Sequence, residues 1–228
     1  MTTTEPARRA RPRPRRGATC KLGRMAQQYA GLGWPVFPLR PGDKVPLSGS
    51  HGCHDATTDE ATINRWWAQE PEANIGAATG HVFDVLDIDG GPEAEAAIDA
   101  MPWPTIGGQA LTALTGGGGL HVFGHPTGEG NRTKFLTGCD WRGAGGYVVL
   151  PPSVHPGTGR RYEWAFGPDC GRLAEWPGPV LKALRKEPVE RPRPRIVRAE
   201  FRPGEHGTAY GIAALDKISA ELAGTGEG

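Results

Sequence analysis

The first regular pattern of apolar positions in this 228-residue chain lies at residues 22–32. Its apolar residues stand three or four positions apart, which predicts a helix with one buried stripe, and Gly31 and Gly33 predict its end. The stripe consists of Leu22, Met25, Tyr29 and Leu32.

A second helix is predicted to begin after Thr58 or Asp59. Either side chain can cap it, because short polar side chains accept hydrogen bonds from the free N–H groups of the first helical turn. Its buried face is predicted to consist of Ile63, Trp66 and Trp67. Shorter helical patterns follow at residues 93–101 and 180–186.

Short apolar runs bounded by glycine and proline predict strands between these helices. They lie at residues 34–39, 73–80, 81–89, 111–114, 120–123, 147–150 and 162–164. Some of these strands are adjacent in sequence and others are separated by helices, a pattern typical of α+β proteins. We therefore expect an α+β sandwich.

The two ends of the chain differ from this central body, which we assign to residues 21–186. Residues 1–20 are rich in arginine and proline without apolar periodicity, which predicts a disordered basic tail. Residues 187–204 form a Pro/Arg linker, and residues 205–228 contain an amphipathic helix. Two interpretations of that helix stay open: it begins a helical domain that this chain lacks, or it packs back on the body.

Composition limits the class of protein. A hydrophobic content of 37% can support a packed core, and no apolar run approaches the ~20 residues of a membrane span. The basic N-terminus lacks the following apolar stretch of a signal peptide, so we expect a soluble, cytoplasmic protein without membrane association. The net charge of +1 conceals basic residues gathered in 8–21 and 191–202. Such arms are typical of nucleic-acid binding, with a solubilising tail as the alternative.

The cysteines argue against a disulfide framework and against a structural zinc site. Cys20, Cys53, Cys139 and Cys170 lie far apart and form no CxxC pair. His51, Cys53 and His54 do cluster in sequence, but structural zinc takes four ligands, usually as two close pairs, and no second pair is present.

The strongest chemical signal is the acidic strand Asp87-Ile88-Asp89. Alternate side chains of a strand share a face, so Asp87 and Asp89 should lie side by side, with Asp84 on the other face. Two neighbouring carboxylates repel each other, and a hard divalent cation such as Mg²⁺ or Mn²⁺ removes the conflict. The alternative is a pair of solvent-exposed acids ahead of a glycine turn.

A glycine run, residues 116–119, stands directly before a strand that carries His121. Glycines such as Gly118 and Gly119 let backbone N–H groups approach a phosphate closely, and a histidine beyond them can donate to a phosphate oxygen. A glycine hinge before an ordinary half-buried histidine is the alternative interpretation.

A third element contributes Asp140 and Arg142 ahead of another glycine-rich turn. Asp140 on its own would be interpreted as a turn residue, whereas an arginine here suits bidentate phosphate contact. Taken together, the segments supply three carboxylates, a histidine and a phosphate-sized loop. Two-metal phosphoryl transfer uses such a set, because carboxylates hold two cations about 3.5–4 Å apart.

These segments resemble the N-terminal domain of bifunctional DNA primase/polymerases in the archaeo-eukaryotic primase superfamily. The matching stretches cover roughly residues 22–180 in the family's order: GWPVFPLRPGDKVP, DATTDEATINRWWAQEPEANIGAATG, VLDIDG, GGGGLHVF and DWRGAGGYVVLPPSVHPGTGRRYEW.

The resemblance implies a fold of two modules, an α/β module joined to an RRM-like sheet, with the active site between them. It implies that Asp87, Asp89 and Asp140 are catalytic and bind Mg²⁺ or Mn²⁺, and that His121 holds the triphosphate of the incoming nucleotide. It further implies that Lys44 and Arg142 contact phosphates.

The implied activity is template-directed nucleotidyl transfer to a 3′-hydroxyl, in the replication of a plasmid, phage or integrated element. Its partners would be a single-stranded DNA template, nucleoside triphosphates, and a helicase or replication initiator supplied by another chain, because no Walker-type GxxxxGK[ST] motif occurs here. One alternative is a non-catalytic module that binds nucleic acid or nucleotides. A metal-dependent nuclease is another, but it does not require the glycine loop and histidine.

Overall fold

The computed structural model describes residues 20–89, 91–92, 94, 96, 100–102 and 109–185. The predicted linker and C-terminal helix lie outside the described residues, as do all but the last residue of the predicted basic tail and most of the predicted helix at 93–101.

Two helices and a three-stranded antiparallel sheet form the first part of the fold. These elements are α1 (Lys21–Gly31), β1 (Val36–Leu39), the 3₁₀ turn η1 (Gly52–Asp55), α2 (Glu60–Gln69), β2 (Asn74–Ala78) and β9 (Tyr147–Leu150). The strand order is β1-β2-β9, so the last strand returns from far along the chain.

A six-stranded antiparallel sheet forms the second part. In spatial order its strands are β10 (Glu163–Phe166), β5 (Thr112–Leu114), β6 (Leu120–Gly124), β3 (Asp84–Ile88), β8 (Cys139–Arg142) and β7 (Arg132–Leu136). A short parallel pair, β4 (Gln109–Ala110) with β11 (Gly171–Arg172), and the helix α4 (Gly178–Arg185) complete the described elements.

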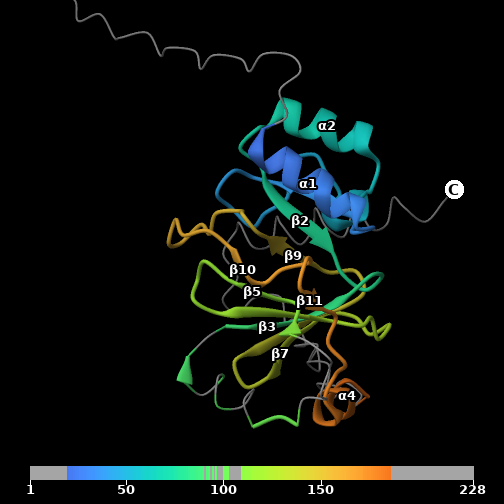
Figure 1. Cartoon of the computed structure of the whole chain (residues 1–228), viewed down its shortest axis with the longest axis vertical. Coiled ribbons are helices and arrows are strands. Elements are labelled where there is room, and N and C mark those ends of the chain that lie inside the picture. Colours follow the sequence, from blue (N-terminus) through green and yellow to red (C-terminus); the bar gives the residue numbers. More distant parts are fainter. Residues whose placement is uncertain are drawn as a thin grey trace, which may run out of the picture. The chain divides into compact units, whose positions relative to one another are not determined.

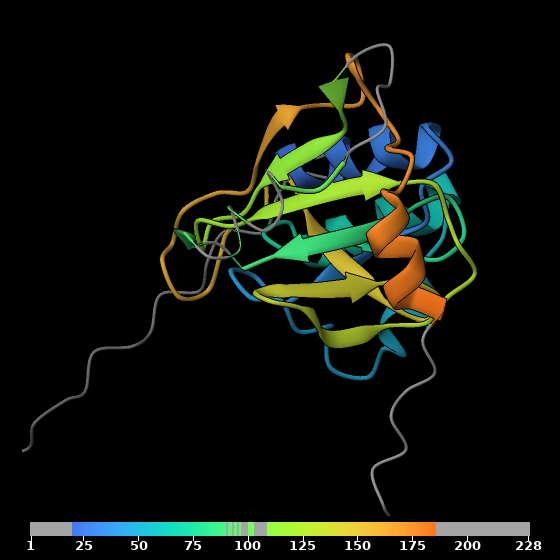
Figure 2. The same ribbon diagram turned by 90° about the horizontal axis from the view of Figure 1, so that it is seen from below.

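The elements are stacked in layers (Figure 1). Helices α1 and α2 cover the three-stranded sheet, the six-stranded sheet follows, and α4 lies beyond it. The view from below shows α4 across the opposite face of the six-stranded sheet (Figure 2). The chain is therefore an α+β protein, as the sequence predicts. The assignment of the six-stranded sheet to an RRM-like module stays a prediction.

The starts of α1 and α2 follow the physics of helix capping. The Asp59 carboxylate accepts a hydrogen bond from the Thr62 N–H at 2.7 Å, which confirms one of the two predicted caps. At α1 the cap is the Cys20 sulfur, which accepts from the Gly23 N–H, and sequence reasoning missed it. The predicted stripe of α1 is wrong at Leu32, which follows the helix and is 52% exposed.

Two strands on one side of β3 were not predicted. β7 is polar and largely exposed, so its composition carries no apolar alternation. β8 was not assigned to a strand, because Asp140 on its own is typical of a turn and a glycine-rich turn follows it. In the structure Asp140 lies inside β8, whose buried residues Cys139 and Trp141 alternate with Asp140 and Arg142.

A cluster of aromatic side chains joins the two sheets. Trp34, just before β1, stacks on Tyr29 of α1 with ring centroids 5.4 Å apart and meets Phe83 edge to face at 5.0 Å. The Tyr29 hydroxyl donates to the Pro151 carbonyl at 2.7 Å and accepts from the Trp164 indole at 2.9 Å. Burial, only partly offset by that indole bond, raises the pKa of Tyr29 to about 12. The cluster thus binds α1 to β10 and to the segment after β9.

The Tyr29 hydroxyl provides a stability test. Tyr29→Phe leaves the Trp164 donor and the Pro151 acceptor without this partner, so we expect the free energy of unfolding to fall by about 1–3 kcal/mol. Tyr147→Phe is the matched control, because its hydroxyl makes one exposed bond to the Lys44 carbonyl and its loss should cost about 0.5 kcal/mol or less. Urea unfolding of both variants checks this, and equal losses would contradict it.

Candidate active site

The register of three neighbouring strands brings the predicted site residues together. On β3, Asp87 lies directly opposite His121 of β6 on one side and opposite Asp140 of β8 on the other. Opposite residues of antiparallel strands share a face, so the three side chains project from the same face of the sheet. Asp84 projects from the other face, as predicted, and its buried carboxylate accepts from the backbone N–H and the hydroxyl of Thr127.

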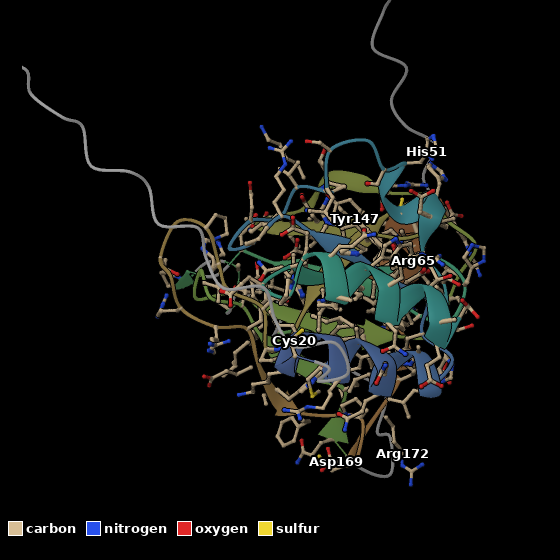
Figure 3. The ribbon with its side chains drawn as sticks, turned by 90° about the horizontal axis from the view of Figure 1, so that it is seen from above. Cys20, His51, Arg65, Tyr147, Asp169 and Arg172 are labelled. Carbon is tan, nitrogen blue, oxygen red and sulfur yellow. The ribbon has the colours of Figure 1, made fainter. Side chains whose placement is uncertain are left out.

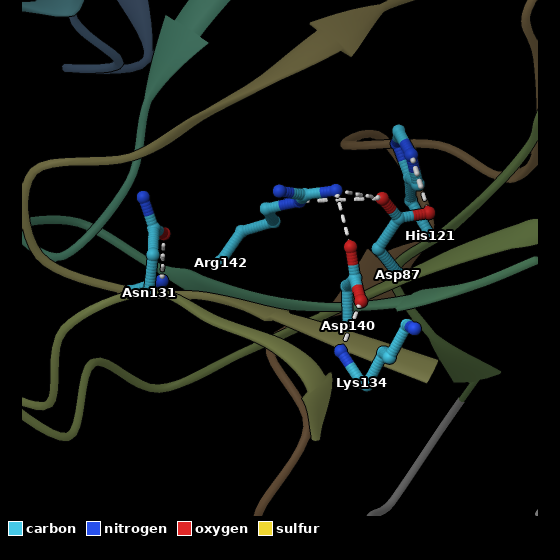
Figure 4. A network of polar contacts seen from close by, with 7 residues as sticks. Asp87, His121, Asn131, Lys134, Asp140 and Arg142 are labelled. Atoms are coloured by element: carbon cyan, nitrogen blue, oxygen red, sulfur yellow. Dashed lines mark hydrogen bonds and ion pairs between the residues drawn. The ribbon is translucent and has the colours of Figure 1, made fainter. Parts of the chain in front are cut away.

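Arg142 bridges the two opposed carboxylates (Figure 4). Its Nη2 lies 3.0 Å from Asp87 Oδ2 and 2.8 Å from Asp140 Oδ2, and its Nε lies 3.3 Å from the same Asp87 oxygen. The other Asp140 oxygen accepts from the Lys134 N–H at 2.7 Å. A single guanidinium therefore neutralises the repulsion between acids that the sheet places side by side.

His121 contacts the remaining oxygen of Asp87. Its Nε2 lies 3.3 Å from Asp87 Oδ1, and its buried Nδ1 has no hydrogen-bond partner among the described residues. Burial alone would raise the pKa of Asp87, but the contacts with His121 and Arg142 outweigh it and lower this pKa to about 2. Asp87 is therefore an anion held by two partners.

Asp89 is the third member of the acidic group. It is exposed at the end of β3, where its backbone N–H donates to the Gly138 carbonyl at 2.9 Å. Partial burial, and then the negative charges of Asp87 and Asp140, raise its pKa. The negative charges of Asp87 and Asp140 therefore act on Asp89, although Arg142 forms ion pairs only with Asp87 and Asp140.

A pocket of about 230 Å³ opens beside Asp87, and both large sheets line it. His121 and Arg142 contribute from the six-stranded sheet and Tyr147 from β9 of the three-stranded sheet, while Lys44 reaches the pocket from the loop after β1. The structure therefore gathers Lys44, Asp87, His121 and Arg142 around one cavity, with Asp140 bound through Arg142.

The glycine run before β6 forms a tight turn against the end of β3. The Gly118 N–H donates to the Thr115 carbonyl and the Gly119 N–H to the Thr115 hydroxyl, so both groups serve the turn itself. A side chain at Gly119 would place its Cβ 2.0 Å from the Ile88 carbonyl oxygen. Glycine there is required for close packing beside the acids. Phosphate binding by Gly118 and Gly119 stays a prediction.

Sequence reasoning missed two side chains that line the pocket. Tyr162 was assigned only to a strand, but its buried ring lies between those of His121 and His155 at 5.9 and 6.1 Å, and it lines the pocket beside Asp87. Burial, and then the charge of Asp87, raise the pKa of Tyr162. Asn131 accepts from the Gly143 N–H at 3.0 Å and so fixes the turn after Arg142. Alternation in Tyr162-Glu163-Trp164 could have predicted the inward tyrosine; no comparable signal marks Asn131.

Comparison with known families decides the identity of the fold. Residues 26–179 match the family described as bifunctional DNA primase/polymerase, N-terminal. The chain belongs to this primase/polymerase family. Among curated proteins no match was found.

Membership confirms the resemblance read from the sequence. The matched span includes every predicted site residue, from Lys44 to Arg142, and the primase/polymerase domain carries nucleotidyl transfer as its family-level activity. Domains of this family bind DNA and nucleotides in general. No helix in the described ranges is long and apolar enough to cross a membrane.

The family is generally metal-dependent, and a bound Mg²⁺ or Mn²⁺ would need oxygen ligands from the protein. Within the described part of the chain, no group of three or more His, Cys, Asp or Glu side chains is arranged as a metal site. Asp87 and Asp140 form ion pairs with Arg142 instead of facing a shared space for a cation. Their chemistry does fit Mg²⁺ or Mn²⁺, since both ions prefer hard carboxylate oxygens.

Two of the residues considered for zinc, His51 and Cys53, have other side-chain partners. The His51 ring contacts the Asp55 carboxylate at 3.1 Å, and the Cys53 thiol donates to the Gly145 carbonyl at 3.4 Å.

The lowered pKa of Asp87 predicts a pH dependence of stability. The pKa of an aspartate is about 3.9 in an unfolded chain, so the stabilisation by Asp87 is complete above that pH and is lost as the pH falls through about 2. Relative to Asp87→Asn, the wild type should therefore lose up to about 2 kcal/mol of unfolding free energy between pH 5 and pH 2. Urea unfolding across this range, with a chelator present, measures the difference; a constant difference would contradict the assignment.

Proposed function

We propose that this protein is a DNA primase/DNA polymerase that transfers nucleotides to a 3′-hydroxyl under the direction of a single-stranded DNA template. The observation that carries the proposal is the register that places Asp140 directly opposite Asp87, which lines a pocket shared by both sheets and Lys44. Asp89 follows on the same strand, and the charges of Asp87 and Asp140 contribute to its raised pKa. Within a primase/polymerase domain, opposed acids beside a pocket of about 230 Å³ suit phosphoryl transfer.

In this proposal the three aspartates hold Mg²⁺ or Mn²⁺. When bound, the cations supply charge stabilisation at the attacking and leaving oxygens. Asp87 supplies an anion that stays ionised at neutral pH, and His121 contacts its second oxygen, which fixes the orientation of the carboxylate. Arg142 holds both Asp87 and Asp140, so it would have to give up these carboxylates for cations to be held there, and its guanidinium would then be available to the phosphates of the nucleotide. Tyr147 and Tyr162 shape the pocket wall.

The biological setting that we propose is the replication of a plasmid, phage or integrated element. We propose that the protein acts together with a helicase or replication initiator, since residues 1–228 contain no Walker-type motif for ATP-driven unwinding. The basic residues near both ends of the chain would neutralise phosphates of the template.

A second candidate is a replication module that binds nucleotides or DNA without turnover. The contact that favours it is the double ion pair of Arg142, which neutralises Asp87 and Asp140 without a cation. An enzyme must break these ion pairs to bind metal, whereas a binding module keeps them.

Nucleotide incorporation separates the two candidates. We expect the wild type to incorporate labelled nucleotides on a single-stranded template with Mn²⁺ or Mg²⁺, tested with and without a primer. Asp87→Asn and Asp140→Asn should each reduce the rate by about 100-fold or more, because several kcal/mol of charge stabilisation are lost.

Asp169→Asn is the matched control for these variants. Asp169 is an exposed acid. In Figure 3 it lies at the lower edge of the molecule, away from Tyr147, which lines the pocket. Its loss should leave the rate unchanged. Nucleotide binding by the wild type without any incorporation would instead favour the binding module, and near-normal synthesis by Asp87→Asn would contradict the proposed role of that acid.

A further inference from the structure

The hairpin of β7 and β8 is irregular directly opposite Asp140. The two strands pair at both ends of the hairpin, through Arg132 with Trp141 and Leu136 with Cys139. Between these pairs β7 has three residues, 133–135, whereas β8 has Asp140 alone. We call residues 133–135 the β7 bulge. Bulges redirect the groups around them and are frequent next to active sites.

Lys134, in the middle of the β7 bulge, has a left-handed backbone. Its φ is 52°, and in the described ranges it is the one residue other than glycine with a positive φ. Residues with a side chain rarely adopt this conformation, and they keep it only where the surrounding contacts impose it. In this conformation the Lys134 N–H donates to Asp140 Oδ1 at 2.7 Å (Figure 4).

Contacts on both sides hold the β7 bulge in place. On one side, the Arg132 guanidinium donates to the Glu129 carboxylate at 2.9 Å and to the Ala183 carbonyl of α4 at 3.4 Å. On the other side, the Phe135 ring packs against that of the buried Trp141, with ring centroids 5.7 Å apart. The left-handed residue therefore lies between two anchored neighbours.

The two oxygens of Asp140 have different kinds of partner. Oδ1 accepts from the uncharged Lys134 N–H, and Oδ2 contacts the Arg142 guanidinium at 2.8 Å. The same Arg142 nitrogen, Nη2, lies 3.0 Å from Asp87 Oδ2. A backbone N–H orients a carboxylate without neutralising its charge, whereas a guanidinium does both. The orientation of Asp140 therefore does not depend on Arg142 alone.

The turn of the same hairpin holds a second acid. The Gly138 carbonyl accepts from the Asp89 N–H at 2.9 Å. One hairpin thus contacts Asp140 through its side chain and Asp89 through its main chain, in each case with a backbone group.

We infer that the left-handed backbone of Lys134 positions Asp140 for cation binding: its N–H holds Oδ1, so that Oδ2 stays on the side where Arg142 now contacts both Asp140 and Asp87. The inference rests on the proposed function, since it concerns an acid that we propose as a ligand of Mg²⁺ or Mn²⁺. It assigns a positioning role to the conformation of residue 134 and not to the charge of its side chain.

Substitutions of Lys134 separate conformation from charge, because each removes the same ammonium group. Glycine and asparagine adopt a positive φ readily, whereas the β-branched valine does not. We expect Lys134→Gly and Lys134→Asn to bind Mn²⁺ within about twofold of each other, and Lys134→Val about tenfold more weakly than either, the usual effect of losing a partner that orients a metal ligand. Electron paramagnetic resonance of free Mn²⁺, without nucleotide, measures these affinities.

Two controls show whether the effect belongs to residue 134. Glu163→Val places the same β-branched side chain at an exposed position of the edge strand β10. Arg161→Gln removes an exposed positive charge whose guanidinium donates to the Pro152 carbonyl at 2.9 Å. Neither residue lines the pocket beside Asp87, so both variants should change Mn²⁺ affinity by less than about twofold, as for surface charges.

Hydrogen exchange tests the bond itself and does not depend on whether Lys134→Val folds. An N–H at an exposed position exchanges quickly unless a hydrogen bond protects it. Asp140→Ala removes the acceptor, so the Lys134 amide should exchange at least about tenfold faster than in the wild type. The Asp89 amide is the internal control, because it also lies near the charge of Asp140 but donates to the Gly138 carbonyl, and its rate should stay the same.

Equal Mn²⁺ affinities of Lys134→Gly, Lys134→Asn and Lys134→Val would overturn the inference, as would an unchanged exchange rate of the Lys134 amide in Asp140→Ala. The proposed function fails in a different way. Protein that shows both expected effects but incorporates no nucleotide would contradict the catalytic proposal alone. Wild-type protein that incorporates nucleotides, with equal Mn²⁺ affinities of the three variants, would contradict the positioning role alone.

Discussion

The repulsion between Asp87 and Asp140 is the interaction on which the site depends. The two acids are directly opposite on adjacent antiparallel strands, and unit charges about 4 Å apart repel by roughly 4 kcal/mol at an effective dielectric constant of about 20. A sheet keeps such a pair only if a cation offsets it. Here the guanidinium of Arg142 does so, and the contacts of Asp87 with His121 and Arg142 lower the pKa of Asp87.

The rest of the fold holds these groups in place. Val85 and Asp87 project from the same face of β3. Val85 packs in the core with residues of the three-stranded sheet, whereas Asp87 lines the pocket. The aromatic cluster around Trp34 fixes the distance between the sheets on the packed side. On the open side, the close approach of Gly119 to Ile88 lets the turn before β6 reach the end of β3. Rigid packing on one side thus gives a defined cavity on the other.

The sequence predicted the parts of the site that obey local rules. Alternation placed Asp87 and Asp84 on opposite faces, because the period of a strand is independent of tertiary structure. It failed for Asp140, since Cys-Asp-Trp-Arg is short and adjacent glycines favoured a turn. It could not find Asn131, because the role of this residue depends on its contact with the turn after Arg142, on another segment of the chain.

Manganese binding measures the central claim most directly, namely that Arg142 is the counterion of a carboxylate pair that otherwise binds cations. Free Mn²⁺ can be titrated by electron paramagnetic resonance in the absence of nucleotide, with Arg161→Gln as the control. Arg142→Gln removes the competing guanidinium, so the account predicts about tenfold tighter Mn²⁺ binding than in the wild type, equivalent to about 1.4 kcal/mol. Unchanged or weaker binding by Arg142→Gln would contradict it.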